Sequence, residues 1–151
     1  MRRKEKEIKD VKAIESIIRS SNVCHLALSD GDQPYIVPLC FGYRLDVLYF
    51  HSALEGKKIE IIKKNPNVCF EFEKDIDIIK GEKPCGWGMK YISVIGSGKA
   101  SIIDDAEDKI NAVKIIMRQY SDQDFDFKVD DLNRIAIIKV EIREMTGKKS
   151  G

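Results

Sequence analysis

Hydrophobic residues near both ends of the chain recur with the period of a helix. In the segment 10–21 they stand three or four positions apart, and Asp10 precedes them as a candidate N-cap. The same spacing follows the pair Asp104-Asp105. The apolar positions are Val11, Ile14, Ile17 and Ile18 in the first pattern, and Ile110, Val113, Ile116, Met117 and Tyr120 in the second. These patterns predict two long amphipathic helices.

Between the helices and after the second one the apolar runs are bounded by turn residues, as is typical of β-strands. The sequence predicts strands at 23–28, 35–43, 47–50, 68–72, 91–103 and 135–142. The pair Asp30-Gly31 favours a tight hairpin because both residue types tolerate a positive φ. We therefore expect the first three strands to form a meander.

The remaining segments predict other kinds of structure. A short helix is expected at 56–64, where Asn65-Pro66 ends it. An irregular loop is expected at 74–88. Gly96 and Gly98 inside the long strand indicate a bend or a close approach of two backbones.

The order of these elements favours a mainly β protein. Helices and strands do not alternate as β-α-β units, so a doubly wound sheet is disfavoured and a six-stranded antiparallel barrel with flanking helices is expected. A small barrel fills its interior with its own side chains, so a flat cofactor would lie outside the barrel or at a subunit contact. With 151 residues, the chain is expected to form one domain, 1–151.

Composition excludes several classes of protein. The chain has 26 basic and 25 acidic residues, so its net charge of +1 gives no argument for a nucleic-acid or membrane partner. No apolar run approaches the roughly 20 residues of a membrane helix, and the charged N-terminus lacks the pattern of a signal peptide. We expect a cytoplasmic protein.

The four cysteines give no sign of a metal site. They form no C-x-x-C pair, and only two histidines accompany them, so no metal centre is expected. Cys24, Cys40 and Cys69 fall in apolar runs and are expected to be buried thiols, whereas Cys85 lies in a glycine-rich stretch and is left open.

The segment 49–58, which runs from a strand into a helix, carries the clearest chemical signal. Lys57 and Lys58 fall in the first helical turn, where the positive end of the helix dipole disfavours cations by a few tenths to about 1 kcal/mol. A bound anion would remove this conflict, and the Ser52 hydroxyl with the first helical N–H groups would complete a phosphate cradle. The alternative, of equal weight, is that both lysines are simply solvated.

Two other residues are notable for their context. His51 follows an apolar strand at the mouth of the cradle, although such a histidine is more often a packed, hydrogen-bonded residue. Trp87 stands between Gly86 and Gly88, which suggests a ring that lines a pocket or stacks on a ligand. The alternative for Trp87 is that it caps one end of the barrel.

Five blocks of sequence together resemble a known family. They are Gln-Pro-Tyr-Ile-Val-Pro-Leu at 33–39, Leu-Tyr-Phe-His-Ser-Ala at 48–53, Gly-Lys-Lys at 56–58, Asn-Pro-Asn-Val-Cys-Phe at 65–70 and Tyr-Ile-Ser-Val-Ile-Gly at 91–96. In this order and spacing they resemble the FMN-binding split-barrel family related to pyridoxamine 5′-phosphate oxidase, and within it the Nim-type 5-nitroimidazole resistance proteins. The likeness covers nearly the whole chain.

The resemblance implies a homodimer that binds FMN at the subunit interface. In that arrangement Val37, Pro38 and Leu39 lie along the isoalloxazine ring, Lys57 and Lys58 bind the phosphate with Ser52, His51 faces the reactive side of the ring, and Trp87, Tyr91 and Ser93 approach the ring from the same or the partner subunit.

The resemblance also implies an activity. The segment 142–147 lacks the histidine of the segment with which oxidases that make pyridoxal phosphate hold their substrate, so vitamin B6 oxidation is disfavoured. The expected function is an FMN-dependent reductase that takes electrons from a donor and passes them to a nitroimidazole or another nitroaromatic acceptor, with His51 as the catalytic residue. The alternatives are a non-catalytic flavin-storage protein, or a split barrel that holds haem or a deazaflavin.

Overall fold

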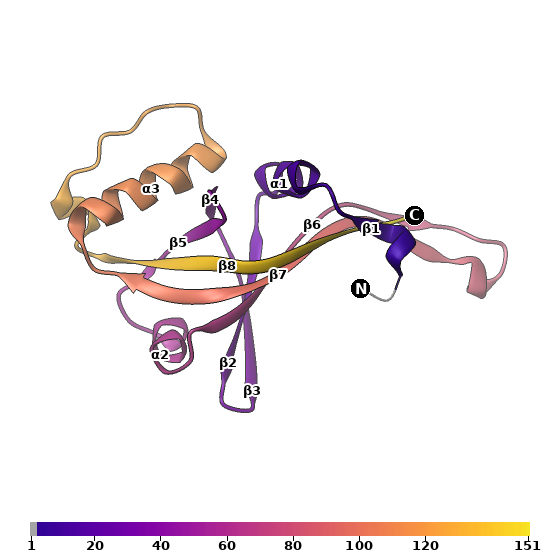
Figure 1. Ribbon diagram of the computed structural model, residues 1–151, viewed down its shortest axis with the longest axis horizontal. Helices are drawn as coiled ribbons and strands as arrows, with labels where there is room; N and C mark the ends of the chain where they lie inside the picture. Colours follow the sequence, from indigo (N-terminus) through magenta and orange to yellow (C-terminus); the bar gives the residue numbers. More distant parts are fainter. Residues whose placement is uncertain (1–2) are drawn as a thin grey trace.

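The computed structural model describes residues 3–151, which form one antiparallel sheet with three α-helices around it (Figure 1). The strands are β1 (Glu7–Ile8), β2 (Cys24–Asp30), β3 (Gln33–Leu39), β4 (Gly42–Arg44), β5 (Val47–Ala53), β6 (Asn67–Ile79), β7 (Gly88–Ile103) and β8 (Ile135–Ser150). The α-helices are α1 (Val11–Arg19), α2 (Lys57–Lys64) and α3 (Ala106–Tyr120), and short 3₁₀ turns lie at Lys4–Lys6, Pro84–Gly86 and Val129–Leu132.

The strands follow the order β3-β2-β6-β7-β8-β5-β4, and β1 pairs with the far part of β8. Every pair is antiparallel. The end strands β3 and β4 do not pair with each other, so the curled sheet does not close and the barrel stays split. The expected mainly β split barrel is confirmed, with eight strands in residues 3–151 rather than six, because β1 was not predicted and the expected strand 35–43 is divided into β3 and β4.

The predicted meander is wrong. β3 pairs only with β2, while β4 and β5 form a separate hairpin at the other end of the sheet. The expected single strand 35–43 is broken at Cys40-Phe41, because the Phe41 N–H donates to the Tyr120 hydroxyl at 2.9 Å. A contact with α3 that is remote in sequence therefore ends the strand.

Side-chain caps define the starts of the two predicted long helices. The Asp10 carboxylate accepts from the Lys12 N–H at 3.2 Å, and the Asp105 carboxylate accepts from the Asp108 N–H at 2.9 Å. The segments expected to be helical at 10–21 and after Asp105 are thus confirmed as α1 and α3.

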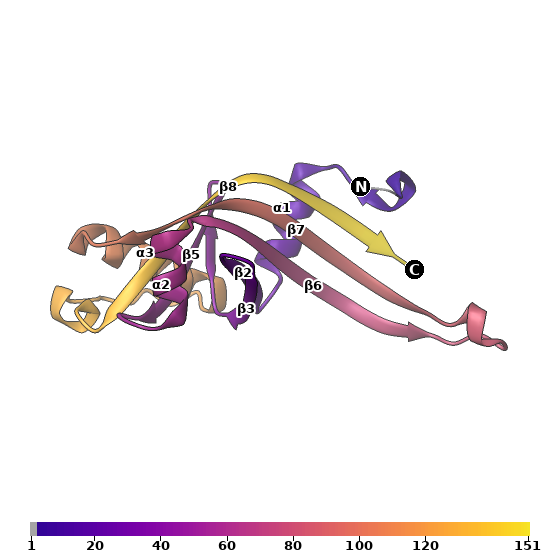
Figure 2. The ribbon, with the colours of Figure 1, turned by 90° about the horizontal axis from the view of Figure 1, so that it is seen from below.

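The expected irregular loop at 74–88 is wrong over much of its length. β6 continues to Ile79, with a bulge between Lys74 and Asp77, and β7 begins at Gly88. At the bulge Asp75 has a φ of 54°. The two strands form an arm that projects beyond the rest of the sheet (Figures 1 and 2). Its exposed apolar side chains are Ile76, Ile78, Ile79, Trp87 and Met89.

The main core lies on the inner face of the curled sheet. Phe41, Phe50, Phe70 and Phe72 are fully buried there, and α1 and α2 close the core with isoleucines. A Cβ at Gly96 would lie 2.2 Å from Phe70 Cζ, so this glycine allows the close approach predicted from the sequence. A second, smaller core forms on the outer face of the sheet, where α3 packs against β5 and β8.

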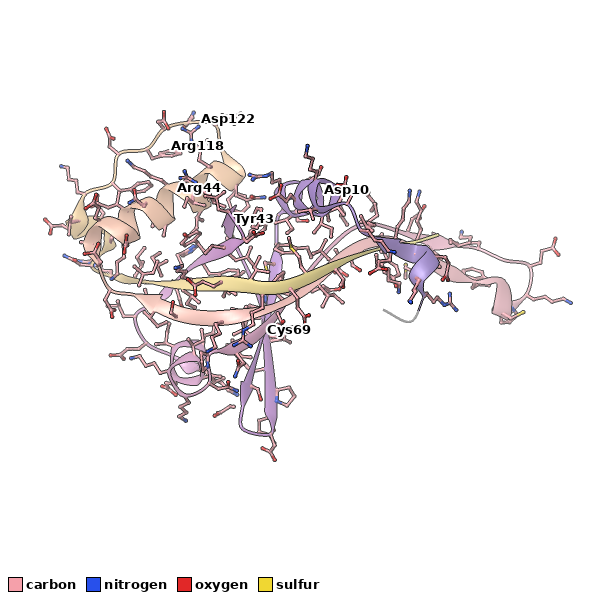
Figure 3. The ribbon with its side chains drawn as sticks, viewed as in Figure 1. Asp10, Tyr43, Arg44, Cys69, Arg118 and Asp122 are labelled. Carbon is pink, nitrogen blue, oxygen red and sulfur yellow. The ribbon has the colours of Figure 1, made fainter. Side chains whose placement is uncertain are left out.

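The cysteine expectations hold in part. Cys24 is buried as expected, and burial raises the pKa of its thiol well above the ordinary value. Cys40 and Cys69 are exposed, which corrects the prediction (Figure 3 labels Cys69). Cys69 alternates with Val68 and Phe70 on β6, so it faces outward and its thiol donates to the Gly96 carbonyl at 3.0 Å. Cys85, which was left open, is exposed.

No helix in residues 3–151 is both long enough and apolar enough to cross a bilayer.

Candidate functional site

The N-terminus of α2 follows an exposed glycine. Gly56 has a φ of 125°, which an L side chain rarely adopts, and it turns the chain from β5 into the helix. Within residues 3–151 no side chain caps the first turn. Lys57 and Lys58 are its first two residues, and Glu60 is the acid of that turn. The first N–H groups and two ammonium groups therefore gather at one helix end.

Lys57 also contacts the edge strand of the sheet. Its ammonium lies 4.7 Å from the ring centroid of Tyr35 on β3. Tyr35 is half-buried and shares its strand face with Val37 and Leu39. The structure therefore places Lys57 next to the strand that carries the segment 37–39.

The segment 37–39 presents two different surfaces. Val37 and Leu39 are half-buried and pack against the main core, whereas Pro38 is exposed on the outer face. Because β3 ends the sheet, one of its edges has no strand partner in the described residues. Backbone groups along that edge can bond to a ligand, and Pro34 and Pro38 reduce the risk of pairing with another strand.

The side chains of Ser52 and His51 point to opposite faces of the sheet at β5. Ser52, opposite Ala136 of β8, is 7% exposed and points to the inner face that α2 covers. His51, opposite Ile137, is exposed on the outer face, the side on which α3 packs. Only Ser52 faces the same side of the sheet as α2, so the two residues do not form one cluster.

Trp87, Tyr91 and Ser93 lie far from α2 along the sheet. Trp87 is 53% exposed near the tip of the arm, so it does not cap the barrel. Tyr91 and Ser93 lie on the outer face of β7. Across the sheet, Ile36 of β3 pairs with Ala27, Ala27 with Cys69, and Cys69 with Ser97 of β7. Tyr35, next to Ile36, is therefore level with the part of β7 near Ser97. Tyr91 lies six residues away from Ser97, roughly 20 Å further along β7. One chain does not bring these three residues to Lys57.

Tyr91 has a cationic partner of its own. The Lys148 ammonium donates to the Tyr91 hydroxyl, and this hydrogen bond lowers the pKa of the phenol from its ordinary value. Ser93, directly opposite Lys148, is buried. The phenol is therefore held in a positively charged setting on the outer face of the sheet.

Sequence patterns did not single out two of these contacts. Tyr35 under Lys57, and Lys148 beside Tyr91, each join residues from elements that are distant along the chain. The one sequence signal near Tyr35 is the block 33–39, which contains it.

Comparison with known proteins identifies one matching family and several similar structures. Residues 10–149 match the family model described as pyridoxamine 5′-phosphate oxidase. The structure is similar to a proposed 5-nitroimidazole antibiotic resistance protein from Bacteroides thetaiotaomicron, with 37% identity, 95% of this chain and 86% of that chain covered, and a TM-score of 0.84. No match is found among curated proteins.

Two more distant structures share the fold. The flavocytochrome Anf3 from Azotobacter vinelandii has 15% identity, with 100% of this chain and 72% of that chain covered and a TM-score of 0.86. The FAD- and haem-binding protein from Mycobacterium smegmatis has 13% identity, with 96% and 73% covered and a TM-score of 0.81. With a family match over nearly its whole length and a 37% identical relative, the chain belongs to the pyridoxamine 5′-phosphate oxidase family.

Proposed function

We propose that this protein is an FMN-dependent oxidoreductase that reduces small acceptors such as nitroimidazoles or other nitroaromatics. The observation that carries the cofactor assignment is the open N-terminus of α2, with Lys57 and Lys58 in its first turn and Lys57 over Tyr35 of the edge strand. The acceptor class rests on the 37% identity to the Bacteroides relative.

The residues at this helix end suit the phosphate of FMN. A phosphate carries about two negative charges at neutral pH and accepts several hydrogen bonds. The first N–H groups of α2 and the ammonium groups of Lys57 and Lys58 supply donors and positive charge. Ser52, nearly buried on the same side of the sheet, supplies a hydroxyl.

The edge strand suits the ring of the same molecule. Backbone groups of 37–39 would bond to the polar edge of an isoalloxazine, and Val37 and Leu39 would keep water from its face. Because the Lys57 ammonium already rests on Tyr35, little side-chain freedom is lost when it binds phosphate.

Bound FMN would supply the redox chemistry, taking electrons from a donor and passing them to the acceptor. His51 stands on the opposite face of β5 from Ser52, so we assign it to the acceptor and not to the phosphate grip. As an exposed imidazole it can give a proton to the acceptor and recover one from solvent.

A second copy of the chain would complete the site. Trp87, Tyr91 and Ser93 are too far from Lys57 to reach the same ring within one chain, so we propose that they come from the partner in a two-fold dimer. The arm that carries Trp87 exposes several apolar side chains, as a surface that packs on a partner would.

The proposal is tested by the visible spectrum of the freshly purified protein and by its reactivity. We expect flavin bands, and rapid reoxidation when the dithionite-reduced protein is mixed anaerobically with a 5-nitroimidazole. A flavin that stays reduced would favour storage over catalysis. A haem Soret band without flavin would overturn the cofactor assignment.

A further inference from the structure

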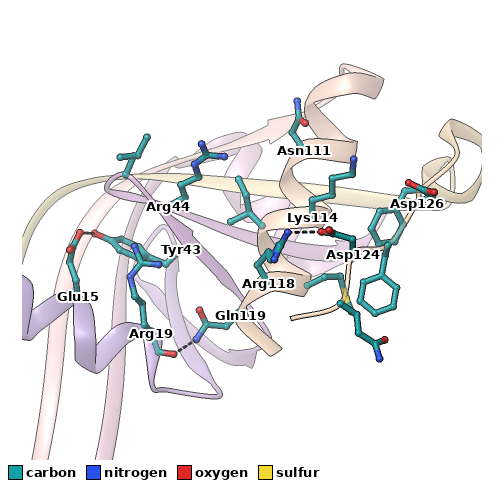
Figure 4. Close-up of a pocket in the computed structure, with 16 residues that line it drawn as sticks. Glu15, Arg19, Tyr43, Arg44, Asn111, Lys114, Arg118, Gln119, Asp124 and Asp126 are labelled. Carbon is teal, nitrogen blue, oxygen red and sulfur yellow. Dashed lines mark hydrogen bonds and ion pairs between the residues drawn. The ribbon is translucent and has the colours of Figure 1, made fainter. Parts of the chain in front are cut away.

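A large cleft lies on the opposite side of the protein from α2. It has a volume of about 870 Å³ and is bounded by α1, β4, α3 and the segment 121–127 (Figure 4). Cavities of about 300–1,000 Å³ are typical of small-molecule sites. None of the residues that line it belongs to α2 or to the segment 35–39, and α1 and α3 lie on the opposite side of β8 from α2 in Figure 1, so the cleft is separate from the proposed flavin site.

Aromatic rings form part of its wall and are held in place. Tyr43 is buried, and its hydroxyl lies 3.0 Å from Glu15 Oε1 and 3.2 Å from Asp46 Oδ1. Burial and these carboxylates raise the pKa of the Tyr43 phenol, so it stays neutral. Phe125 packs on Phe127, with 6.3 Å between ring centroids, and Phe127 packs on the second core.

Two sets of polar contacts fix the shape of the cleft. Arg118 pairs with Asp124 and ties the segment 121–127 to α3. The Gln119 amide donates to the carbonyls of Arg19 and Ser21, each at 2.9 Å, and so ties α3 to the end of α1. The cleft is therefore preformed, so a ligand that binds in it has to order few side chains or loop residues.

Three cations reach this cleft from three elements. Arg19 of α1, Arg44 of β4 and Lys114 of α3 all line it (Figure 4). Within residues 3–151 no carboxylate lies within ion-pair distance of any of them. Arg19 lies over the Tyr43 ring instead, 5.4 Å from its centroid.

The acids of the cleft balance this charge only in part. Asp124 is paired with Arg118, and Glu15 is bonded to the Tyr43 hydroxyl. Over the whole lining, the four cations Arg19, Arg44, Lys114 and Arg118 stand against the three acids Glu15, Asp124 and Asp126, which leaves a net charge of +1. The cleft is therefore net positive and attracts anions.

We propose that this cleft is a second ligand site, which binds an aromatic ring that carries a phosphate or carboxylate group. Arg44 and Lys114 hold the anionic group, and Phe125 contacts the ring. This ligand binds away from α2, and its binding does not require flavin at α2.

The test is calorimetric titration of the full-length protein with three probes: AMP, benzoate and inorganic phosphate. AMP or benzoate is expected to bind at least tenfold more tightly than inorganic phosphate. Tighter binding of AMP would identify the anionic group as a phosphate, and tighter binding of benzoate would identify it as a carboxylate. The absence of AMP and benzoate binding at about 10 mM, a free energy near −2.7 kcal/mol, would overturn the proposal.

Variants locate the site. Arg44→Gln with Lys114→Gln is expected to lower the affinity for the more tightly bound aromatic probe at least tenfold, since two charge-assisted contacts are lost. The matched control, Lys12→Gln with Lys99→Gln, changes two exposed lysines outside the cleft and should leave affinity unchanged. Phe125→Ala should lower the affinity for AMP and benzoate and leave the affinity for inorganic phosphate unchanged.

Two further outcomes decide the remaining cases. If the Arg44/Lys114 variant and its control bind the stronger aromatic probe with equal affinity, the proposed site is contradicted. If the double variant does not fold, Arg44→Gln alone is used in its place. Lys57→Ala with Lys58→Ala should leave AMP binding at the cleft unchanged. Loss of AMP binding in that variant would place the probe at α2 and overturn the proposal, whatever the outcome for FMN.

Discussion

The ammonium of Lys57 lies 4.7 Å from the ring centroid of Tyr35, and this contact joins the first turn of α2 to the edge strand β3. The lysine is therefore held at the helix end, although the helix dipole disfavours a cation there. The contact compensates for part of that cost, since a cation over an aromatic face at an exposed site is worth about 0.5–1 kcal/mol.

This contact predicts the effect of changing the ring. Tyr35→Leu should weaken FMN binding about twofold to fivefold, because Lys57 loses the surface that orients it. Tyr35→Phe keeps an aromatic face and should bind FMN nearly as well as the wild type. Quenching of FMN fluorescence measures both affinities, and equal weakening in the two variants would show that the hydroxyl, not the ring, matters.

The close packing at Gly96 predicts a loss of stability. A Cβ there would lie 2.2 Å from Phe70 Cζ and 2.7 Å from the Glu144 carbonyl oxygen, so Gly96→Ala should destabilise the fold by about 1–3 kcal/mol. Thermal unfolding should show a midpoint lowered by several degrees. Gly88→Ala is the matched control, because its nearest neighbour would be 3.9 Å away. Equal midpoints for the two variants would contradict the packing.

The Lys148–Tyr91 hydrogen bond predicts a pH effect. It lowers the pKa of Tyr91 in the folded protein, so Lys148→Met should raise that pKa toward about 10, the ordinary tyrosine value. A lowered folded pKa adds stability above the unfolded pKa, and this increment disappears as the pH falls through the folded pKa. NMR titration of ¹³C-labelled tyrosines, with Tyr91→Phe to assign the signal, measures it. An unchanged Tyr91 pKa in the Lys148 variant would refute the contact.

The exposed arm predicts the behaviour of the proposed dimer. Ile78→Asp should shift the protein toward monomer and lower its flavin content, because a charge would be placed at a dry interface. Val11→Asp is the matched control, since Val11 is 58% exposed and Ile78 is 56% exposed. Sedimentation followed at protein and flavin wavelengths checks this, and a monomer with one FMN per chain would exclude an interface site.

Periodicity was a good guide to much of the fold. The two long helices, the strands around Phe50, Phe70 and Ile138, and the close approach at Gly96 follow from local patterns and are confirmed. The failures have physical causes. The strand 35–43 is broken by a hydrogen bond from the Phe41 N–H to Tyr120. The arm after Lys74 is exposed on both faces, so no packing against a core marks it as a strand.

The candidate site was harder to predict than the fold. A helix start with two lysines is visible along the chain, but its neighbour Tyr35 depends on how β3 passes α2. The alternation of a strand implies that Ser52 and His51 face opposite sides, a consequence the sequence interpretation did not use. The cleft between α1 and α3 has no local signal, because its cations come from three elements.

The FMN affinity of two double variants on the same helix tests the central claim most directly. Lys57→Ala with Lys58→Ala removes two charge-assisted contacts worth about 1.5–3 kcal/mol each, so FMN should bind at least tenfold more weakly. Lys63→Ala with Lys64→Ala removes the same charge from the other end of α2 and should bind FMN like the wild type. If the folded Lys57/Lys58 variant keeps wild-type FMN affinity, or if both variants lose it equally, α2 does not hold the phosphate.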